Sequence, residues 1–196
     1  MLLSATCPGC RRVGRGFRAD GAEMPRLRKV LALDAGKVIA DIGAGKGELT
    51  LALAREVGPS GHVFATEINA ARLGRLRLAV AGAKLSNVAI VEARSRESGL
   101  PSSCCDAIVL RRVYHHLTDP ASLNASLLRT LRPGGVLAVI DSPPPFFWSR
   151  RSLGVPAQAV VTEIARSGFE PLALIDDWPG RGPLPSYCVL FRKPRV

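Results

Sequence analysis

A glycine-rich turn between two apolar segments constrains the fold of this chain more than any other feature. Residues 38–50 read VIADIGAGKGELT, so a short apolar run ends in an acid and is followed by Gly43, Gly45 and Gly47. The apolar run is typical of a buried strand, and the segment after the glycines has helical spacing. Because glycine has no Cβ, it lets a loop take unusual dihedral angles and approach a ligand closely. The pattern predicts a strand that turns tightly into a helix.

The spacing of these glycines separates two classes of nucleotide site. A dinucleotide fingerprint, Gly-x-Gly-x-x-Gly, would need glycine at position 48, where the chain has Glu48. The chain instead has Asp-x-Gly-x-Gly-x-Gly from Asp41 to Gly47. An NAD-dependent oxidoreductase is therefore disfavoured, and it stays an alternative together with a structural turn that binds nothing.

A second acid follows at a suggestive distance. The apolar segment Gly61–Glu67 reads as a strand and ends in Glu67, 20 residues after Gly47. A strand-end carboxylate at this separation meets the ribose hydroxyls of an adenosine ligand. A carboxylate suits this role because it accepts two hydrogen bonds in a fork. The alternative is that Glu67 is a solvated acid at a strand end. Its spacing from the glycine pattern makes this alternative the weaker one.

Strand and helix signals continue to alternate along the chain, which predicts an α/β protein with a parallel sheet. Thr118-Asp119-Pro120 is a helix start, with a capping side chain and proline in the first turn. At 196 residues, the chain is long enough for one domain with a substantial core. The further predicted strands are 87–91, 106–110, 136–140, 172–175 and 187–191, and a further helix is predicted from 156 to about 167.

The order of these motifs resembles a known family. Besides the glycine pattern, the chain has Tyr-His-His-Leu at 114–117 after the fourth strand and Leu-Arg-Pro-Gly-Gly at 131–135 before the fifth. Together they resemble class I S-adenosylmethionine (SAM)-dependent methyltransferases, nearest to the small-molecule branch with the ubiquinone/menaquinone-type enzymes. The resemblance covers residues 34–141 well. It implies a Rossmann-like doubly wound sheet of seven strands, order 3-2-1-4-5-7-6, with strand 7 antiparallel.

The resemblance also implies a reaction and a set of cofactor contacts. The reaction is direct methyl transfer from SAM to a small-molecule acceptor, with S-adenosylhomocysteine as product, and alignment is the enzyme's main contribution. Asp41 would help to hold the amino group of SAM, directly or through water, and Glu67 would hold the ribose. The residues expected beside the methionine portion are Gly43, Ala44, Gly45, Gly47 and Arg111.

One position departs from the family pattern. Relatives commonly have Gly-Asp after the third strand, where the acid accepts from the adenine amino group, and this chain has Ala93-Arg94. Arginine has no hydrogen-bond acceptor. Either Glu92 or a backbone carbonyl replaces the acid, or Arg94 stacks on the base, or affinity for the cofactor is reduced. A non-catalytic SAM- or adenosine-binding module therefore stays an alternative.

The chain has three histidines, of which His62, in the approach to the second strand, is most simply structural, whereas His115 and His116 follow the fourth strand, at the edge that faces the cofactor in a doubly wound sheet. If the stretch after the fourth strand is extended, neighbouring side chains point to opposite sides and one of the pair enters the cleft. His116 matches the family in its His-Leu-Thr-Asp-Pro context. An imidazole there would accept the proton of the methyl acceptor, and the alternative is that His116 shapes the pocket by bonding to the next loop.

The net charge of +11 raises the question of a nucleic-acid partner. The basic residues are scattered, and the densest cluster lacks the interleaved aromatics of a base-stacking surface. We expect no specific nucleic-acid binding, with an RNA methyltransferase as the alternative. We predict a basic leader with a short helix (about 22–33) over residues 1–33, and one methyltransferase domain over 34–196. The cluster comprises Arg11, Arg12, Arg15, Arg18, Arg26, Arg28 and Lys29.

The cysteines and apolar runs indicate neither a metal site nor a membrane span. Cys7-Pro8-Gly9-Cys10 has the spacing of half a zinc site, and no second pair follows at a suitable distance. An odd count of five argues against a disulfide framework. No apolar run approaches the ~20 residues of a membrane helix, and Met1-Leu2-Leu3 is too short for a signal-peptide core. We expect a cytoplasmic protein of unknown oligomeric state.

Overall fold

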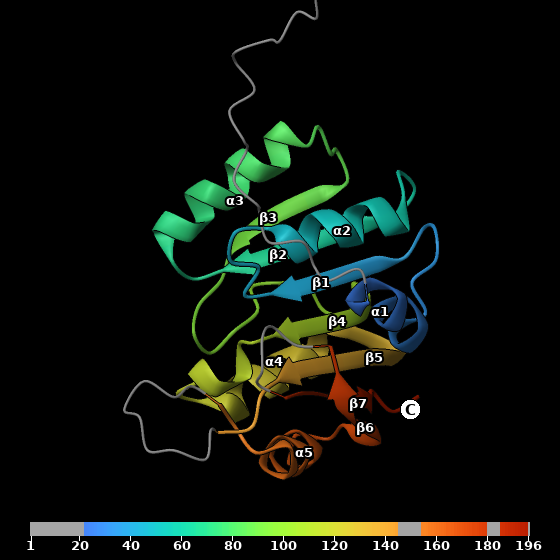
Figure 1. Ribbon diagram of the computed structural model, residues 1–196, viewed down its shortest axis with the longest axis vertical. Coiled ribbons are helices and arrows are strands. Elements are labelled where there is room, and N and C mark those ends of the chain that lie inside the picture. Colours follow the sequence, from blue (N-terminus) through green and yellow to red (C-terminus); the bar gives the residue numbers. More distant parts are fainter. Residues whose placement is uncertain (1–21, 145–153, 180–184, 196) are drawn as a thin grey trace, which may run out of the picture.

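A seven-stranded sheet runs through the centre of the molecule (Figure 1). The computed structural model describes residues 22–144, 154–179 and 185–195. The strand order is β3-β2-β1-β4-β5-β7-β6, and β7 runs antiparallel to both of its neighbours while the other pairs are parallel. This confirms the predicted topology. The strands are β1 (Val38–Ile42), β2 (His62–Glu67), β3 (Val88–Glu92), β4 (Cys105–Arg111), β5 (Leu131–Asp141), β6 (Glu170–Trp178) and β7 (Ser186–Arg192).

Helices cover both faces of the sheet. The side chains of α1 (Glu23–Leu31) and α2 (Glu48–Val57) pack on one face, and those of α4 (Pro120–Thr130) and α5 (Ala157–Arg166) pack on the other. The helix α3 (Ala70–Gly82) packs over β2 and β3. Strand residues alternate between the two cores, so Ile39, Val63, Ala107 and Val109 meet α1 and α2, whereas Ala40, Ile108 and Leu110 meet α4 and α5.

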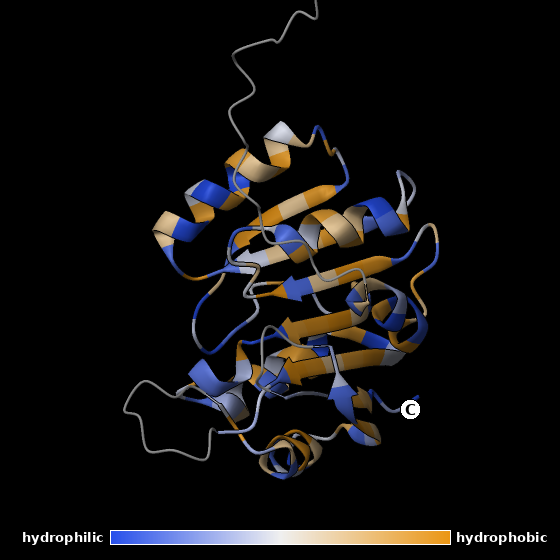
Figure 2. Cartoon of the chain, viewed as in Figure 1, coloured by the Kyte–Doolittle hydropathy of each residue, from blue (hydrophilic) through white to orange (hydrophobic). Residues whose placement is uncertain are grey.

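The central strands are buried on both faces, and Figure 2 shows them as largely hydrophobic ribbons. This explains why they are continuous apolar runs in the sequence rather than alternating ones. Cys105 and Cys188 are fully buried in these two cores, as expected for packing residues. Within the described part of the chain, no helix is long and apolar enough to cross a membrane.

The predicted start of α4 is confirmed in detail. Asp119 is the N-cap, and its carboxylate accepts from the backbone N–H of Ser122 at 3.1 Å, with Pro120 in the first turn. The following strand begins earlier than predicted. Leu131 pairs with Cys105, and pairing then resumes between Val136 and Ala107, so the Arg-Pro-Gly-Gly segment between them forms a bulge inside β5.

The short helix predicted at about 22–33 is found as α1, residues Glu23–Leu31. Leu27 and Leu31 are buried against the sheet, and so is Leu33 just after the helix. The predicted basic leader (1–21), which includes Cys7 and Cys10, lies outside the described residues. The boundary at residue 34 stays a prediction.

The register brings four charged residues to one edge of the sheet. Asp41 pairs with Val109 and Ala65, and Arg111 pairs with Ile140 next to Asp141. Because β1, β2, β4 and β5 are parallel, their carboxyl ends meet at the same edge, and each of them ends within one residue of a charged side chain. In open α/β sheets, ligands bind outside this edge. The strand-end charges are Asp41, Glu67, Arg111 and Asp141.

Candidate active site

The glycine loop follows β1 at this edge and is held in a conformation that needs glycine. Gly43 has φ 72°, and a Cβ added there would lie 2.6 Å from a methyl carbon of Val113. Gly47 has φ 88°, and its Cβ would lie 2.7 Å from a methyl carbon of Leu76. Real Cβ atoms do not approach other atoms so closely. The glycines therefore let the loop pass tightly between the segment after β4 and helix α3.

Glu67 ties this loop to the end of β2. Glu67 is 2 % exposed, and its carboxylate accepts hydrogen bonds from three backbone N–H groups, of Gly45 at 3.0 Å, Ile68 at 2.9 Å and Asn69 at 3.0 Å. Two carboxylate oxygens offer about four acceptor positions. One position therefore remains for a ligand hydroxyl while the loop is held, and the predicted two-hydroxyl fork requires Gly45 N–H to give up its bond.

Asp41, the other acid predicted to bind cofactor, is buried at the end of β1. Its carboxylate accepts a hydrogen bond from the Thr50 hydroxyl of α2 at 2.6 Å. Burial raises the pKa of Asp41 to about 6, while Thr50 and Arg111 act in the opposite direction. A buried carboxylate of this kind gains stability from a nearby cation. Asp41 is thus suited to a positively charged ligand group.

Arg111 is engaged by helix α1, an interaction that the sequence analysis missed. Its guanidinium donates to Glu23 at 2.8 Å, and both side chains are mostly buried, at 16 % and 7 % exposed. The indole N–H of Trp178, at the end of β6, donates to the other Glu23 oxygen at 3.4 Å. The first turn of α1 and the last residue of β6 are therefore joined at the carboxyl edge of β4.

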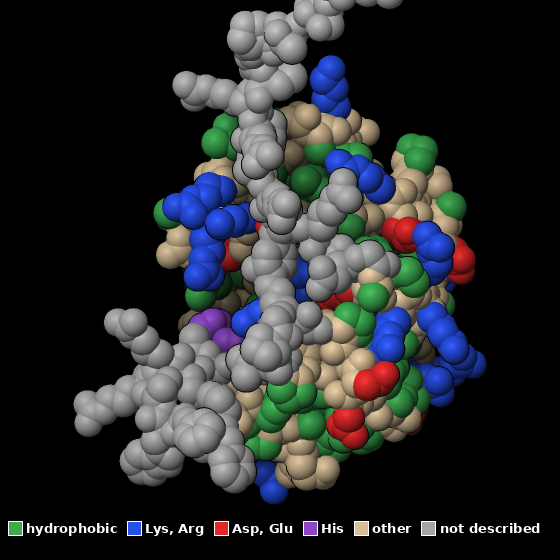
Figure 3. Space-filling view, in the orientation of Figure 1, with side chains coloured by type: hydrophobic (Ala, Val, Ile, Leu, Met, Phe, Trp, Pro, Cys, Tyr) green, Lys and Arg blue, Asp and Glu red, His purple; other side chains and the backbone are tan. Residues whose placement is uncertain are grey.

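The two adjacent histidines lie in a turn rather than in an extended segment, so the sequence expectation of opposite orientations was wrong. Residues Tyr114–His116 form a short 3-10 helix, η1. The rings of His115 and His116 lie 4.1 Å apart at a tilt of 50°. A 3-10 turn places successive side chains about 120° apart rather than on opposite sides. Figure 3 shows histidine side chains at the surface beside Lys/Arg side chains.

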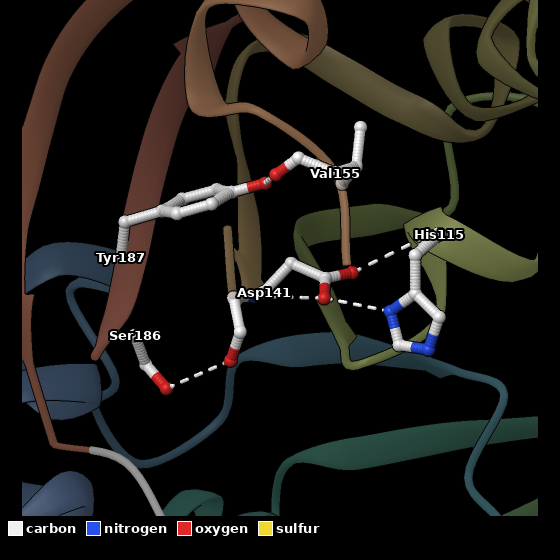
Figure 4. A network of polar contacts seen from close by, with 6 residues as sticks. His115, Asp141, Val155, Ser186 and Tyr187 are labelled. Atoms are coloured by element: carbon white, nitrogen blue, oxygen red, sulfur yellow. Dashed lines mark hydrogen bonds and ion pairs between the residues drawn. The ribbon is translucent and has the colours of Figure 1, made fainter. Parts of the chain in front are cut away.

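His115 forms a short polar contact with Asp141 at this edge (Figure 4). Its Nδ1 lies 2.7 Å from the Asp141 carboxylate, and its backbone N–H donates to the same carboxylate at 3.3 Å. The Ser142 N–H also donates to Asp141, at 2.9 Å. The side chains of His115 and Asp141 are 6 % and 1 % exposed. This is a buried histidine–carboxylate pair at the ends of β4 and β5.

His116, the predicted proton acceptor, is exposed and lies outside this pair. Partial burial, His115 and Arg72 each lower the pKa of His116 below its usual range, and Asp141 opposes them. No described residue holds the His116 ring through a hydrogen bond. Its role as a base stays a prediction.

Glu92 and Arg94, the residues predicted to contact adenine, lie at the end of β3 and just after it, beside Glu67. Glu92 pairs with Glu67 across β3 and β2, so the two carboxyl-end acids are neighbours. Arg94 starts a tight turn in which its backbone exchanges two hydrogen bonds with Glu97. The side chains of Glu92 and Arg94 are exposed. Across the described ranges, no group of three or more His, Cys, Asp or Glu side chains is arranged to hold a metal ion.

A family profile described as "Methyltransferase domain" matches residues 40–139, which run from β1 through most of β5. The chain belongs to this methyltransferase family. The matched region contains the glycine loop, Glu67, Arg111 and both histidines of η1. The resemblance to class I SAM-dependent methyltransferases is therefore confirmed.

Curated relatives include ubiquinone/menaquinone biosynthesis C-methyltransferases UbiE. The protein from Vibrio vulnificus (strain YJ016) is 35% identical over 114 residues, which are 57% of this chain and 44% of that protein. The one from Psychromonas ingrahamii is 31% identical over 141 residues, 71% of this chain and 52% of that protein. The chain thus spans about half the length of the curated relatives it matches.

Solved structures show the same fold. A SAM-dependent methyltransferase from Aquifex aeolicus has a TM-score of 0.75 at 21% identity, covering 87% of this chain and 89% of that one. Phosphoethanolamine N-methyltransferase 2 from Haemonchus contortus, solved in complex with S-adenosyl-L-methionine, has a TM-score of 0.74 at 14% identity and covers 88% and 52%. At these identities the likeness concerns the fold.

Proposed function

We propose that this chain is a SAM-dependent methyltransferase that transfers a methyl group to a small-molecule acceptor and releases S-adenosylhomocysteine. One observation carries the proposal: the Gly45 N–H donates to Glu67, so the glycine loop and the strand-end acid form one unit at the carboxyl edge. In this family, that edge would receive the methionine portion and the ribose on adjacent elements.

The residues of the loop fit such a ligand. Gly43, Ala44, Gly45 and Gly47 would lie beside the methionine portion, and the N-terminus of α2 would offer backbone N–H groups and its positive dipole to the carboxylate there. Asp41 would hold the amino group, since a cation favours the charged form of its buried carboxyl. The backbone at Arg111 would lie near the methionine portion, and the ion pair with Glu23 would hold the Arg111 side chain in place.

Adenine would lie beyond Glu67, next to the exposed side chains of Glu92 and Arg94. Glu92 offers the acceptor that Arg94 lacks, and Arg94 offers a flat guanidinium that stacks on a base. When bound, SAM supplies an electrophilic methyl group. The protein contributes alignment of that methyl with the acceptor.

The small-molecule acceptor is supported by the named relatives, which are C-methyltransferases of ubiquinone and menaquinone biosynthesis. The first of these relatives aligns with this chain over 114 residues, which are 44% of its own length, so the acceptor itself stays open. The cytoplasmic location also stays a prediction.

Ligand-dependent thermal stability tests the proposal. S-adenosylhomocysteine or SAM at ~100 times its dissociation constant should stabilise the fold by ~2.7 kcal/mol and raise the melting temperature, whereas NAD should not. Glu67→Ala should reduce the shift, and Glu170→Ala, an exposed acid on β6, should leave it unchanged. A shift with NAD alone would support an oxidoreductase. Binding of SAM with no methyl transfer to any acceptor tried would favour the non-catalytic module.

A further inference from the structure

We propose that His115, positioned by Asp141, is the general base that takes the proton of the methyl acceptor; the inference rests on the proposed function. It assigns the role to a different residue from the one favoured by the sequence pattern. It also implies that the acceptor carries an ionisable proton that must leave as the methyl group arrives.

Asp141 determines which nitrogen of His115 carries the proton. Asp141 already accepts from two backbone N–H groups, of His115 and Ser142, which hold its carboxylate in place. A carboxylate has no proton to donate, so the 2.7 Å contact requires a proton on Nδ1 of His115. The neutral ring then has its lone pair on Nε2. In Figure 4 this nitrogen is turned away from Asp141.

The surroundings of His115 connect it to the cofactor loop. Val113, two residues earlier, lies against Gly43 so closely that a Cβ there would come within 2.6 Å of it. His115 therefore follows a residue that touches the glycine loop, and its own side chain pairs with the end of β5, at the edge where the methyl group would be presented. No described residue hydrogen-bonds Nε2 of His115, and the side chain is 6 % exposed. The lone pair on Nε2 is therefore available to a ligand.

The charges around the pair favour an acceptor that becomes an anion. Asp141 is paired with His115, and the fixed cation Arg72 is close enough to the adjacent His116 to disfavour its protonation. An ammonium group would add positive charge beside them, whereas an acidic hydroxyl gives up a proton and becomes an oxyanion. We therefore place a phenolic or enolic hydroxyl opposite Nε2.

The step balances without any further reactant. The hydroxyl proton moves to Nε2 of His115, giving an imidazolium that Asp141 stabilises. An electron pair of the resulting oxyanion, or of the ring carbon conjugated with it, forms the new bond to the methyl carbon. The carbon–sulfur bond breaks with its electron pair on sulfur, giving the neutral thioether. For a carbon acceptor, the proton on that carbon leaves afterwards to solvent and restores the ring, and the imidazolium returns its own proton to solvent.

The probe 4-nitrophenol tests this base directly because its anion is yellow. In the complex with S-adenosylhomocysteine, at a pH about one unit below the pKa of the free probe, wild-type protein should raise the bound anion-to-phenol ratio at least about tenfold. His115→Asn keeps a donor toward Asp141 and removes Nε2, so it should abolish the increase. Asp141→Asn should reduce it. Nitrogen chemical shifts of His115 should show the Nδ1–H form in the wild type.

Two further histidine variants serve as controls. His62→Asn, at the start of β2 on the opposite edge of the sheet, should keep the full increase. His116→Asn should keep most of it, and loss with His116→Asn alongside retention with His115→Asn would overturn the proposal. Failure of the wild type to generate bound anion would also overturn it. Unchanged stabilisation of each variant by S-adenosylhomocysteine shows that the fold and the cofactor site remain, whereas no stabilisation of the wild type would refute the proposed function instead.

Discussion

At the scale of single residues, the candidate site combines a backbone conformation that only glycine adopts easily with a buried carboxyl group. Gly43 needs its positive φ and the absence of a Cβ, and Asp41 needs its hydroxyl partner to remain buried. An ordinary loop in place of the glycine loop, or an apolar side chain in place of Asp41, would stabilise the ligand-free fold more. Both are explained by a ligand that lies against the loop and brings a positive charge to Asp41.

The loop glycines can be tested with a matched pair. Gly43→Ala and Gly36→Ala both place a side chain at positive φ, 72° and 86°, which costs ~1–2 kcal/mol. At Gly36 an added Cβ would meet only Ser60 Oγ, at an ordinary 3.8 Å, whereas at Gly43 it would lie 2.6 Å from Val113. Gly43→Ala should be the less stable variant in denaturant unfolding and should lose S-adenosylhomocysteine binding. Equal stability and equal binding of the two variants would contradict the close-approach argument.

Asp41 predicts a specific pH dependence. Its folded pKa is raised to about 6, so between its usual value and pH 6 the folded state holds a proton that the unfolded state has released. Folding stability therefore falls as pH rises through this window, by up to ~3 kcal/mol from this group. Asp41→Asn still accepts from Thr50 and removes the titration. In urea unfolding between pH 4 and pH 7, this variant should show a smaller decline in the free energy of unfolding, and it should bind the cofactor more weakly. The same pH dependence in the variant and the wild type would contradict the assignment to Asp41.

At the scale of elements, α1 is joined to the site through Glu23. The ion pair with Arg111 and the Trp178 N–H connect the first turn of the helix to two strand ends. Burying this pair requires removing both charges from water, so the loss of one partner leaves an uncompensated charge inside the protein. The helix thus completes the carboxyl edge as well as covering the sheet.

The matched test compares two ion pairs of the same helix. Glu23→Gln should destabilise the fold by ~3–5 kcal/mol because Arg111 stays buried without its partner. Arg26→Gln removes the exposed pair with Asp177, at 41 % and 78 % side-chain exposure, and should change stability by no more than ~1 kcal/mol. Denaturant unfolding measures both. Similar small effects for the two variants would mean that solvent reaches Arg111.

The sequence predicted elements better than it predicted their contacts. Apolar runs and turn residues identified the strands, and the resemblance supplied their order, because both depend on local patterns. The η1 turn was missed because nothing local distinguishes three residues of 3-10 helix from an extended segment. Glu23 and Arg111 lie 88 residues apart, so their pairing emerges only from the fold. Asp141 could have been predicted as a site residue, because it lies at the carboxyl end of a parallel strand, as Asp41 and Glu67 do.

At the scale of the whole molecule, the net charge is +11, and the cations of the described residues are spread over several elements. Several described cations are paired with acids, and Figure 3 shows Lys and Arg side chains in separate groups rather than one continuous surface on this face. Arg72, Arg75 and Arg77 of α3 are exposed. The paired cations are Arg26, Arg28, Arg96, Arg111 and Arg132, with Asp177, Glu56, Asp119, Glu23 and Asp106 as their respective partners.

This distribution predicts weak nucleic-acid binding that does not depend on sequence. Phosphate contacts release counterions, so the logarithm of the binding constant should fall linearly with the logarithm of salt concentration, with a slope of about −0.7 per contact for single strands. Fluorescence anisotropy with two RNAs of equal length and different sequence, measured over a salt series, should give overlapping curves. Arg72→Gln with Arg75→Gln should reduce the slope and leave S-adenosylhomocysteine binding unchanged. Tight binding to one RNA that survives moderate salt would instead make RNA the methyl acceptor.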